Sequence, residues 1–283
     1  MKSEPHVRRV RKDFMKYKLI TSDFDNTIYD GNRISPRVLR AIAAYREAGG
    51  KFVVSTGRVF ASILKKLPSL GVDDEVIACQ GSAIYRASTG EVLERFPLSP
   101  ELARKAVDFF ESKGDVCHAY ADTEFFVAEK NPLSEAYADY CDARPTYLGR
   151  PLSSFLPEMA FTNKIIGILG ITEIDGRIAE LQAHLGAGAE VTKSSPIFLE
   201  VTSSDAGKGN CLIALAKQLG IPREETVAVG DNLNDLSMVR AAGLGVSVGN
   251  GVDALKKAAD LVVPSIEEDG VAVLLEKAVR DEL

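Results

Sequence analysis

The feature that most constrains the fold is an alternation of short apolar runs and helical segments in the first third of the chain. The apolar runs at residues 17–21, 51–55 and 75–79 are rich in β-forming side chains and predict buried strands. Residues 38–48 and 59–67, which lie between these runs, have helical spacing. Since strands that alternate with helices form βαβ units, the sequence predicts a Rossmann-like, doubly wound parallel sheet.

The same alternation returns in the last third. Helices are predicted over residues 208–219, 234–242, 253–259 and 270–279, and strands over residues 226–230, 245–248 and 261–263. Residues 18–85 and 193–283 are therefore predicted to form one discontinuous α/β core. A basic extension is predicted over residues 1–17.

The middle of the chain has a different texture. Gly90 separates two short β-like runs, helices are predicted over residues 100–112 and 174–185, and a strand is predicted over residues 164–169. We expect residues 86–192 to form a separate α+β module inserted into the core.

Composition narrows the range of partners. The 283 residues are 46% hydrophobic and 26% charged, as in ordinary globular proteins, and the formal net charge is −6. That charge gives no electrostatic reason to expect nucleic acid or a membrane surface as the main partner. The exception is a cluster of basic residues near the N-terminus: Arg8, Arg9, Arg11, Lys12, Lys16 and Lys18. A nucleic-acid-binding arm is one interpretation of this cluster, and a flexible, solvated extension is the favoured one.

Cysteine and histidine spacing indicates neither a zinc site nor a disulfide framework. The four cysteines and three histidines are scattered, with no CxxC motif, and no apolar run approaches 18 residues. We therefore expect a cytoplasmic protein with reduced thiols. The sequence leaves the oligomeric state open.

Two carboxylates follow the first predicted strand, in the run Asp23-Phe24-Asp25-Asn26-Thr27. Side chains two residues apart on an extended segment point the same way, so Asp23 and Asp25 are predicted to converge. Their mutual repulsion favours a bound metal, a covalent nucleophile with an acid/base partner, or both. An Asx-rich turn is the simpler alternative.

A second acidic group follows the strand predicted at residues 226–230. Asp231, Asn234 and Asp235 offer carboxylate and amide oxygens, which suit a hard cation such as Mg²⁺. Ligands of open α/β sheets gather at this edge. The alternative is a solvated loop that caps the next helix.

Thr56, Gly57 and Lys208 are candidate phosphate ligands. Thr56 and Gly57 end the second strand, where backbone N–H groups at a helix start can hold an oxyanion. Lys208 opens a helix, where a cation opposes the helix dipole, so phosphate or Asp23 would explain its position. An ordinary turn at Thr56 and a surface lysine at residue 208 are the alternatives.

In their order along the chain, which is residues 23–27, Thr56, Lys208 and residues 230–235, these four segments resemble the motifs of the haloacid dehalogenase superfamily. The inserted module, Gly81-Ser82 after the third strand and the run Glu268-Asp269-Gly270-Val271 resemble its Cof-type subfamily, which carries an α/β cap at that place. The resemblance implies a hydrolase of phosphoric monoesters. One departure is Gln80, where the family often has Asn.

The resemblance also implies residue roles. Asp23 would be the nucleophile that forms an aspartyl-phosphate, and Asp25 the acid and base. Thr56 and Lys208 would bind the phosphoryl oxygens. Mg²⁺ would be held by Asp23, Asp231 and the backbone carbonyl of Asp25, with Asn234 and Asp235 completing or orienting the shell.

The expected activity is Mg²⁺-dependent hydrolysis of small phosphorylated metabolites, with sugar phosphates as one class. Arg58 and Lys164 are candidate substrate contacts. His118, Tyr120 and Phe161 are weaker candidates for the pocket lining, and packing in the core of the cap is the favoured interpretation for each. The alternatives are a phosphomutase on the same scaffold and a non-enzymatic nucleic-acid-binding or regulatory protein that uses the basic arm.

Overall fold

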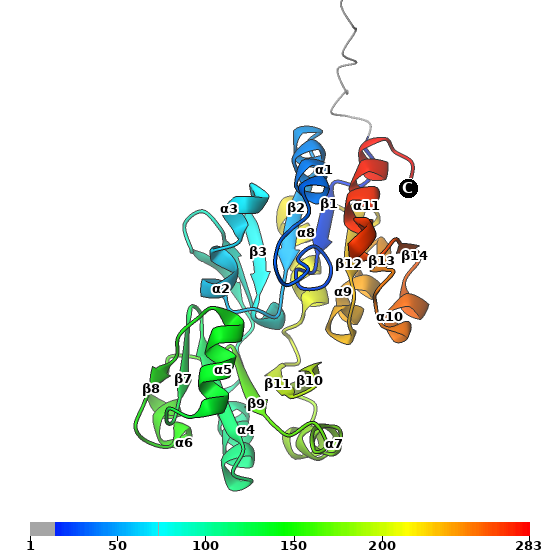
Figure 1. Cartoon of the computed structure of the whole chain (residues 1–283). Helices are drawn as coiled ribbons and strands as arrows, with labels where there is room; N and C mark the ends of the chain where they lie inside the picture. Colours follow the sequence, from blue (N-terminus) through cyan, green and yellow to red (C-terminus); the bar gives the residue numbers. More distant parts are fainter. Residues whose placement is uncertain (1–14, 73) are drawn as a thin grey trace, which may run out of the picture.

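The computed structural model describes residues 15–72 and 74–283. Two β-sheets organise these residues, and each sheet carries its own helices (Figure 1). The core sheet has eight strands in the order β14-β13-β12-β1-β2-β3-β4-β5, and the cap sheet has six in the order β10-β11-β9-β6-β7-β8. The predicted fold class, a doubly wound α/β core with an inserted α+β cap, is confirmed.

The core sheet is parallel from β14 to β3, and β4 and β5 add an antiparallel edge. Both faces of its central strands are buried, because successive side chains such as Leu19 and Ile20 enter different apolar clusters. Its strands are β1 (Leu19–Ser22), β2 (Lys51–Ser55), β3 (Glu75–Ala78), β4 (Ala83–Arg86), β5 (Val92–Arg95), β12 (Thr226–Gly230), β13 (Leu244–Val248) and β14 (Leu261–Val263).

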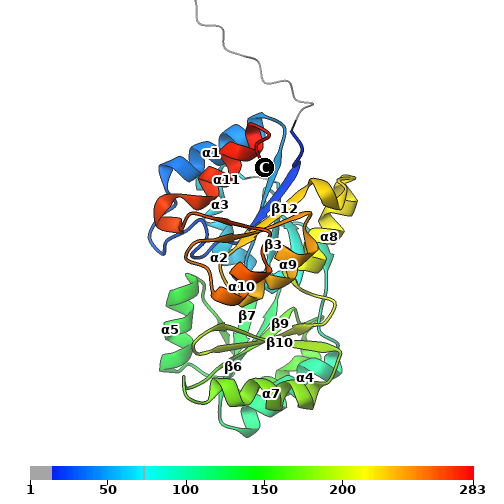
Figure 2. The same cartoon turned by 90° about the vertical axis from the view of Figure 1, so that its right-hand side faces the viewer.

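Helices cover both faces of the core sheet (Figure 2). Helices α1 (Pro36–Glu47) and α11 (Gly270–Val279) lie on one face, and α8 (Lys208–Leu219) and α9 (Leu236–Ala241) lie on the other. Smaller elements complete the core: α2 (Phe60–Leu64), α3 (Leu67–Leu70), α10 (Asp253–Ala258) and the 3₁₀ turns η1 (Cys79–Gly81), η3 (Arg223–Glu225), η4 (Leu233–Asp235) and η5 (Ile266–Glu268).

The single helix predicted at residues 59–67 is wrong, since the structure has two short helices there, α2 and α3. Pro68 accounts for the break. A proline cannot donate to the carbonyl four residues earlier, and that carbonyl belongs to Leu64, the last residue of α2. Pro68 is instead accommodated in the first turn of α3.

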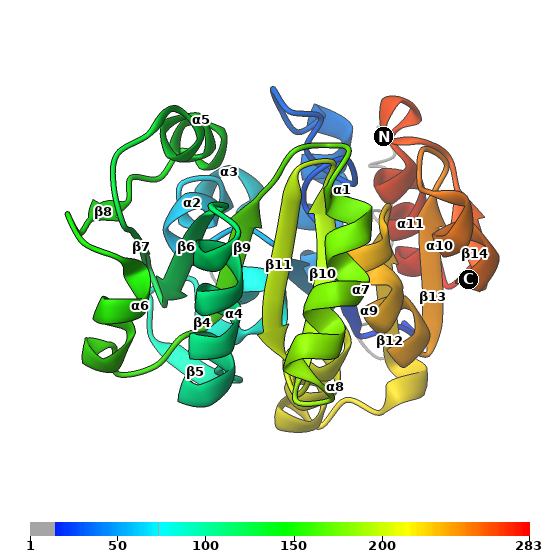
Figure 3. The same cartoon turned by 90° about the horizontal axis from the view of Figure 1, so that it is seen from below.

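The cap sheet is covered by α4 (Pro100–Ser112) and α7 (Ile174–Leu185) on the face away from the core (Figure 3). Helix α5 (Pro132–Cys141) lies on the other face of the cap sheet. The apolar side chains of this face belong to the same buried cluster as side chains of the core sheet. The remaining cap elements are β6 (Val116–Ala121), β7 (Glu124–Val127), β8 (Thr146–Tyr147), β9 (Lys164–Ile168), β10 (Ala189–Ser195), β11 (Phe198–Ser203), α6 (Leu152–Phe155) and η2 (Leu156–Glu158).

The two sheets divide the chain at different residues from the predicted boundaries. Strand β5 belongs to the core sheet, so residues 92–95 lie in the core and not in the predicted cap segment 86–192. Strand β11 and the end of β10 belong to the cap sheet, so residues 193–203 lie in the cap. The apolar pattern of a strand indicates that it is buried, but not which sheet it joins.

Most of the basic N-terminal extension lies outside the described residues, and the prediction of a flexible arm remains a prediction there. In the described part, Tyr17 is buried and its carbonyl accepts a hydrogen bond from the Tyr45 hydroxyl at 2.9 Å. The predicted extension therefore ends before Tyr17. Among the helices of residues 15–72 and 74–283, none has the length and apolarity needed to cross a membrane.

Candidate active site

The two acidic motifs meet because β1 and β12 are parallel neighbours. Ser22 is in register with Val229, and the Asp23 amide donates to the Val229 carbonyl at 2.9 Å. The chain leaves β1 toward α1 on one face of the sheet and leaves β12 toward α9 on the other. Such a reversal opens a crevice at the carboxyl ends of the strands, and Asp23 and Asp231 stand at its edge.

Asp23, Asp231 and Asp235 form a buried group, here called the acid cluster, whose ligand oxygens all lie within 4.8 Å of one another. The Oδ2 atom of Asp235 accepts hydrogen bonds from the backbone N–H groups of Asp231 and Asn232, both at 3.0 Å. Gly230 makes this arrangement possible, because a Cβ atom at that residue would lie 2.4 Å from the carboxyl carbon of Asp235.

Lys208 is bound to the acid cluster. Its Nζ atom donates to Asp23 and, at 2.6 Å, to Oδ1 of Asp235, and the residue is only 1% exposed. The surface-lysine interpretation is therefore wrong. Gly81 permits the placement: its φ is +81°, and a Cβ atom there would lie 2.2 Å from the carbonyl carbon of Gly207, just before α8.

Burial perturbs the ionisation of these groups. Burial raises the pKa of Asp23 well above its usual value, and repulsion from Asp235 adds to this. Burial, again with repulsion from Asp235, raises the pKa of Asp231 to about 6. For Lys208, burial opposes the charged form, but the carboxylates of Asp23 and Asp235 outweigh it and raise the pKa.

The donor set of the acid cluster fits a divalent cation. Three carboxylates face one ammonium group, so two negative charges stay unbalanced when all are ionised. The donors are oxygens, which magnesium prefers. The cluster therefore provides both the charge and the ligand type that a divalent metal needs.

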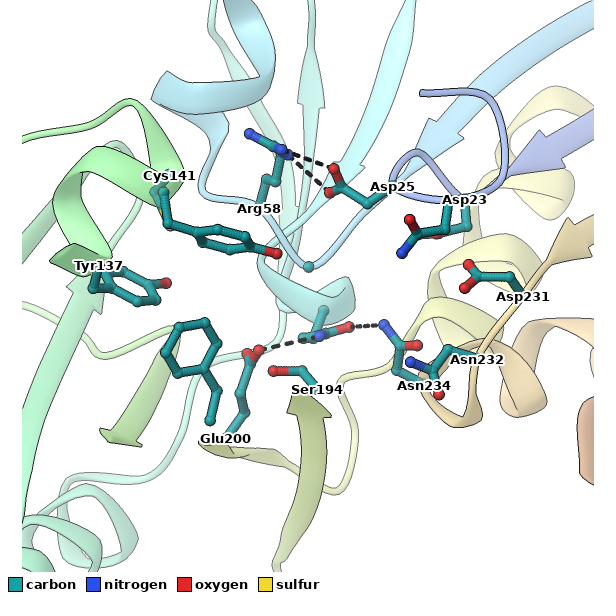
Figure 4. A pocket seen from close by; sticks show the side chains of 15 residues that line it. Asp23, Asp25, Arg58, Tyr137, Cys141, Ser194, Glu200, Asp231, Asn232 and Asn234 are labelled. Carbon is teal, nitrogen blue, oxygen red and sulfur yellow. Dashed lines mark hydrogen bonds and ion pairs between the residues drawn. The ribbon is translucent and has the colours of Figure 1, made fainter. Parts of the chain in front are cut away.

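Asp25 lies apart from the acid cluster and is held by Arg58. The Nη2 and Nε atoms of Arg58 donate to the two Asp25 oxygens at 2.7 and 2.8 Å (Figure 4). Arg58 also donates to the Ser62 hydroxyl at 3.2 Å. Asp23 and Asp25 therefore line the same pocket, but their carboxylates do not share one partner as predicted. The reason is that β1 ends at Ser22, so Asp25 belongs to the loop that follows the strand.

The loop after β2 brings Thr56, Gly57 and Arg58 to the same crevice. The Thr56 hydroxyl accepts a hydrogen bond from the Arg58 amide at 3.1 Å, which is the turn named above as the alternative. Gly57 and Arg58 line the pocket beside Asp23. Thr56 itself is buried, at 1% exposure.

The structure gives partners to two further predicted residues. Asn234 lines the pocket together with Asp23 and Asp231, and it donates from Nδ2 to Oε1 of Gln80 at 3.1 Å. Lys164 is 1% exposed and donates from Nζ to Glu200 at 2.7 Å and to the Gly57 carbonyl at 2.9 Å. Lys164 therefore reaches the site through Glu200 and Gly57.

The pocket lies between core and cap and has a volume of about 100 Å³. Figure 4 shows Asp23, Asp25 and Asp231 of the core facing Tyr137 and Glu200 of the cap. The cap residues that line it, none of them predicted, are Tyr137, Tyr140, Cys141, Ser194, Phe198 and Glu200. Glu200 alone had a sequence signal, as a single acidic residue within the apolar run 197–201.

Of the three residues expected in the core of the cap, His118 and Tyr120 are fully buried there, and His118 contacts the ring of Phe125 at 5.5 Å. Phe161 lies beneath the guanidinium of Arg95, 4.6 Å from its ring centroid.

A sequence model of one family, the haloacid dehalogenase-like hydrolases, matches residues 20–275. The chain belongs to this family. Its motifs and its cap are of the Cof type. The curated relatives that it matches are named phosphatases, and this chain is a phosphatase too.

A putative phosphatase of Streptococcus pyogenes is 28% identical over 270 residues, covering 93% of this chain and 98% of the relative. The 5-amino-6-(5-phospho-D-ribitylamino)uracil phosphatase of Bacillus subtilis is 28% identical over 274 residues. The alignment covers 96% of this chain and 98% of that relative. The solved structure of a haloacid dehalogenase-like hydrolase from B. subtilis superposes with a TM-score of 0.83 at 26% identity, covering 92% of this chain and 99% of that one.

Proposed function

We propose that this phosphatase hydrolyses phosphomonoesters of small metabolites with Mg²⁺ and through an aspartyl-phosphate intermediate. The observation that carries the proposal is Asp23, which accepts a hydrogen bond from the buried Lys208 and lines the same pocket as Asp25. The named activity of the Bacillus subtilis relative, on a phosphorylated ribitylaminouracil, supports a small phosphorylated metabolite as substrate.

Asp23 is the nucleophile in this proposal. Its carboxylate attacks phosphorus and displaces the alcohol, leaving the phosphoryl group on Asp23. Lys208 opposes the rise in the pKa of Asp23 that burial causes, and it offsets the negative charge on the phosphoryl oxygens. The backbone of Gly57, with Thr56 behind it, provides the remaining phosphate contacts.

Asp25 moves the protons. It gives a proton to the departing alkoxide and then takes one from the water that attacks the aspartyl-phosphate, which releases phosphate and restores Asp23. The two hydrogen bonds from Arg58 hold the Asp25 carboxyl group in place at the wall of the pocket.

The metal would be held by the side chains of Asp23 and Asp231 and the backbone carbonyl of Asp25. Asp235, which is bonded to Lys208 and to two backbone amides, orients this group. When bound, Mg²⁺ supplies positive charge that stabilises the transferring phosphoryl group.

Release of inorganic phosphate from p-nitrophenyl phosphate and from a panel of metabolite phosphates tests the proposal. We expect activity with Mg²⁺, none with EDTA, and none in Asp23→Asn. Activity that survives either change would refute the mechanism. A product that is an isomeric phosphate ester, without free phosphate, would identify a phosphomutase instead.

A further inference from the structure

The active-site pocket opens into a second, larger hollow that is mostly apolar. Both hollows are lined by Tyr137, Tyr140 and Phe198 of the cap and by Asn26 and Asn232 of the core. The outer hollow, here called the apolar groove, has a volume of about 620 Å³. Ser194 also lines both hollows, and the further lining of the groove is Ser195 together with six aliphatic residues: Leu133, Ala136, Ile168, Ile171, Pro196 and Ile197.

The apolar groove exposes large hydrophobic side chains to solvent. Ile171 is 67%, Tyr140 59% and Leu133 48% exposed, so three of the eight exposed large hydrophobic residues in the described chain gather here. Exposed apolar side chains that gather in this way mark a surface that binds an apolar group. Its continuity with the pocket points to the substrate as that group.

Aromatic rings form the junction of the two hollows. The Phe198 ring lies 5.0 Å from that of Tyr137, at 78°, and 5.7 Å from that of Tyr140, at 59°. Phe198 is half-buried, so part of its ring remains available to a ligand. Rings in such mixed orientations offer a flat substrate both edge and face contacts.

Polarity therefore changes along the path from the nucleophile. Asp23, Asp25 and Arg58 are at the inner end, polar side chains such as Asn26 and Ser194 are at the junction, and aliphatic side chains are outermost. Hydroxyl groups placed against the aliphatic part would lose hydration without gaining partners. A compact sugar thus fits the outer part poorly.

On the basis of the proposed function, we infer that the preferred substrates are phosphate monoesters whose alcohol carries a flat or apolar body. The phosphate binds at Asp23 and Lys208, a short polar link spans the junction, and the ring or alkyl body fills the apolar groove. Residues of the groove, Ile171 and Leu133 among them, then determine specificity.

The test uses esters whose leaving alcohols have similar reactivity, with Mg²⁺ present. We expect kcat/KM to rise about tenfold or more from ethyl to hexyl phosphate, and to be higher for pyridoxine 5′-phosphate than for glucose 6-phosphate. Ile171→Asp and Leu133→Asp should each remove most of this gain, so that the kcat/KM for hexyl phosphate falls close to that for ethyl phosphate in the same variant. Ile213→Asp is the matched control, since Ile213 is 54% exposed on α8, away from the groove.

Three results would overturn the inference. They are an equal kcat/KM for ethyl and hexyl phosphate, a higher kcat/KM for glucose 6-phosphate than for pyridoxine 5′-phosphate, and equal effects of Ile171→Asp and Ile213→Asp. If no ester is hydrolysed, the proposed function fails, and the groove is judged by calorimetry of the same phosphates. If Kd falls from ethyl to hexyl phosphate in the unaltered protein but not in Ile171→Asp, the groove still binds the apolar body. A Kd that is constant along the series would show that it does not.

Discussion

Lys208 is a cation without contact to bulk water, and its stability in that place depends on its neighbours. Asp23 and Asp235 accept its hydrogen bonds, and both carboxylates are themselves buried. Removing one member of such a group leaves the others charged and uncompensated, which costs more than the group contributes as a whole. At the residue scale, folding and the proposed chemistry therefore depend on the same ammonium group.

Lys208→Met is expected to lower the free energy of unfolding by about 3 kcal/mol and phosphate release by about a hundredfold or more. The two carboxylates then repel each other, and the phosphoryl oxygens lose a cation. Urea unfolding and the phosphate assay measure the two effects. Lys217→Met, an exposed site on the same helix, is the control, and equal behaviour of the two variants would contradict the assignment.

His118 gives the protein a sensitivity to acid. Its imidazole is fully buried beside the Tyr137 ring at 4.9 Å, and neither of its nitrogens has a hydrogen-bond partner among the described residues. Burial lowers the pKa of His118 to about 3, and the charge of Lys164 adds to this. The imidazole is therefore neutral in the folded protein, while in the unfolded chain it takes up a proton below about pH 6.5.

Stability should thus be lost as the pH falls from about 6.5 toward 3, because the unfolded state binds the extra proton. Between pH 7 and pH 5 the unaltered protein should lose about 2 kcal/mol more unfolding free energy than His118→Phe. Urea unfolding of both proteins at the two pH values measures this difference. The same loss in both would show that other groups cause the acid sensitivity.

Strands β9 and β11 are elements that connect the cap to the loops of the candidate active site. Because they pair antiparallel, with Lys164 opposite Thr202, the Lys164 and Glu200 side chains lie on one face and meet at 2.7 Å. Glu200 also accepts from Gln80 Nε2 at 3.2 Å, and Gln80 accepts from Asn234. Sheet register thus links the cap to the loop that carries Asp231.

Removing one partner of the buried Lys164–Glu200 pair should lower the free energy of unfolding strongly, because the other charge stays buried without a partner. Removing both partners should cost less than the sum of the two single changes. Lys164→Met and Glu200→Leu are each expected to destabilise by about 3 kcal/mol, and the double variant by clearly less than their sum. Urea unfolding measures the cycle. The exposed pair Lys105 and Glu101, 2.8 Å apart, is the control, and its removal should change the free energy of unfolding far less. Additive losses at Lys164 and Glu200 would argue against direct coupling.

In the whole molecule, the acid cluster joins segments from the two ends of the core. Asp23 follows β1 and Asp231 follows β12, with the entire cap between them in the sequence. A cation bound there connects the two segments only in the folded state. By mass action, such a ligand stabilises the folded protein.

Mg²⁺ is therefore expected to raise the Tm, by an amount equivalent to about 2.7 kcal/mol at a hundred times its Kd. EDTA should reverse the shift, and Asp231→Asn should abolish it. A melting curve with increasing Mg²⁺ provides the measurement. Asp253→Asn, an exposed carboxylate at the start of α10, should keep the full shift, and an unchanged shift in Asp231→Asn would place the metal elsewhere.

The sequence by itself determined the layers of the core and the sheet edge at which the candidate active site lies. Alternating strands and helices require a doubly wound sheet, and Asp23 and Asp231 follow strands that end at the same edge. Such local patterns depend on neighbours a few residues apart, so a single chain reveals them. Gly81 and Gly230 also lie within these motifs, although only the structure shows the close approaches that they permit.

The tertiary structure alone decided the partners of the remaining groups. Arg58 holds Asp25, Lys164 binds Glu200, and aromatic side chains of α5 and β11 close the pocket. These contacts depend on how the cap sheet packs over the core and on its strand register. Both follow from the burial of side chains distant in the sequence, which no local pattern specifies.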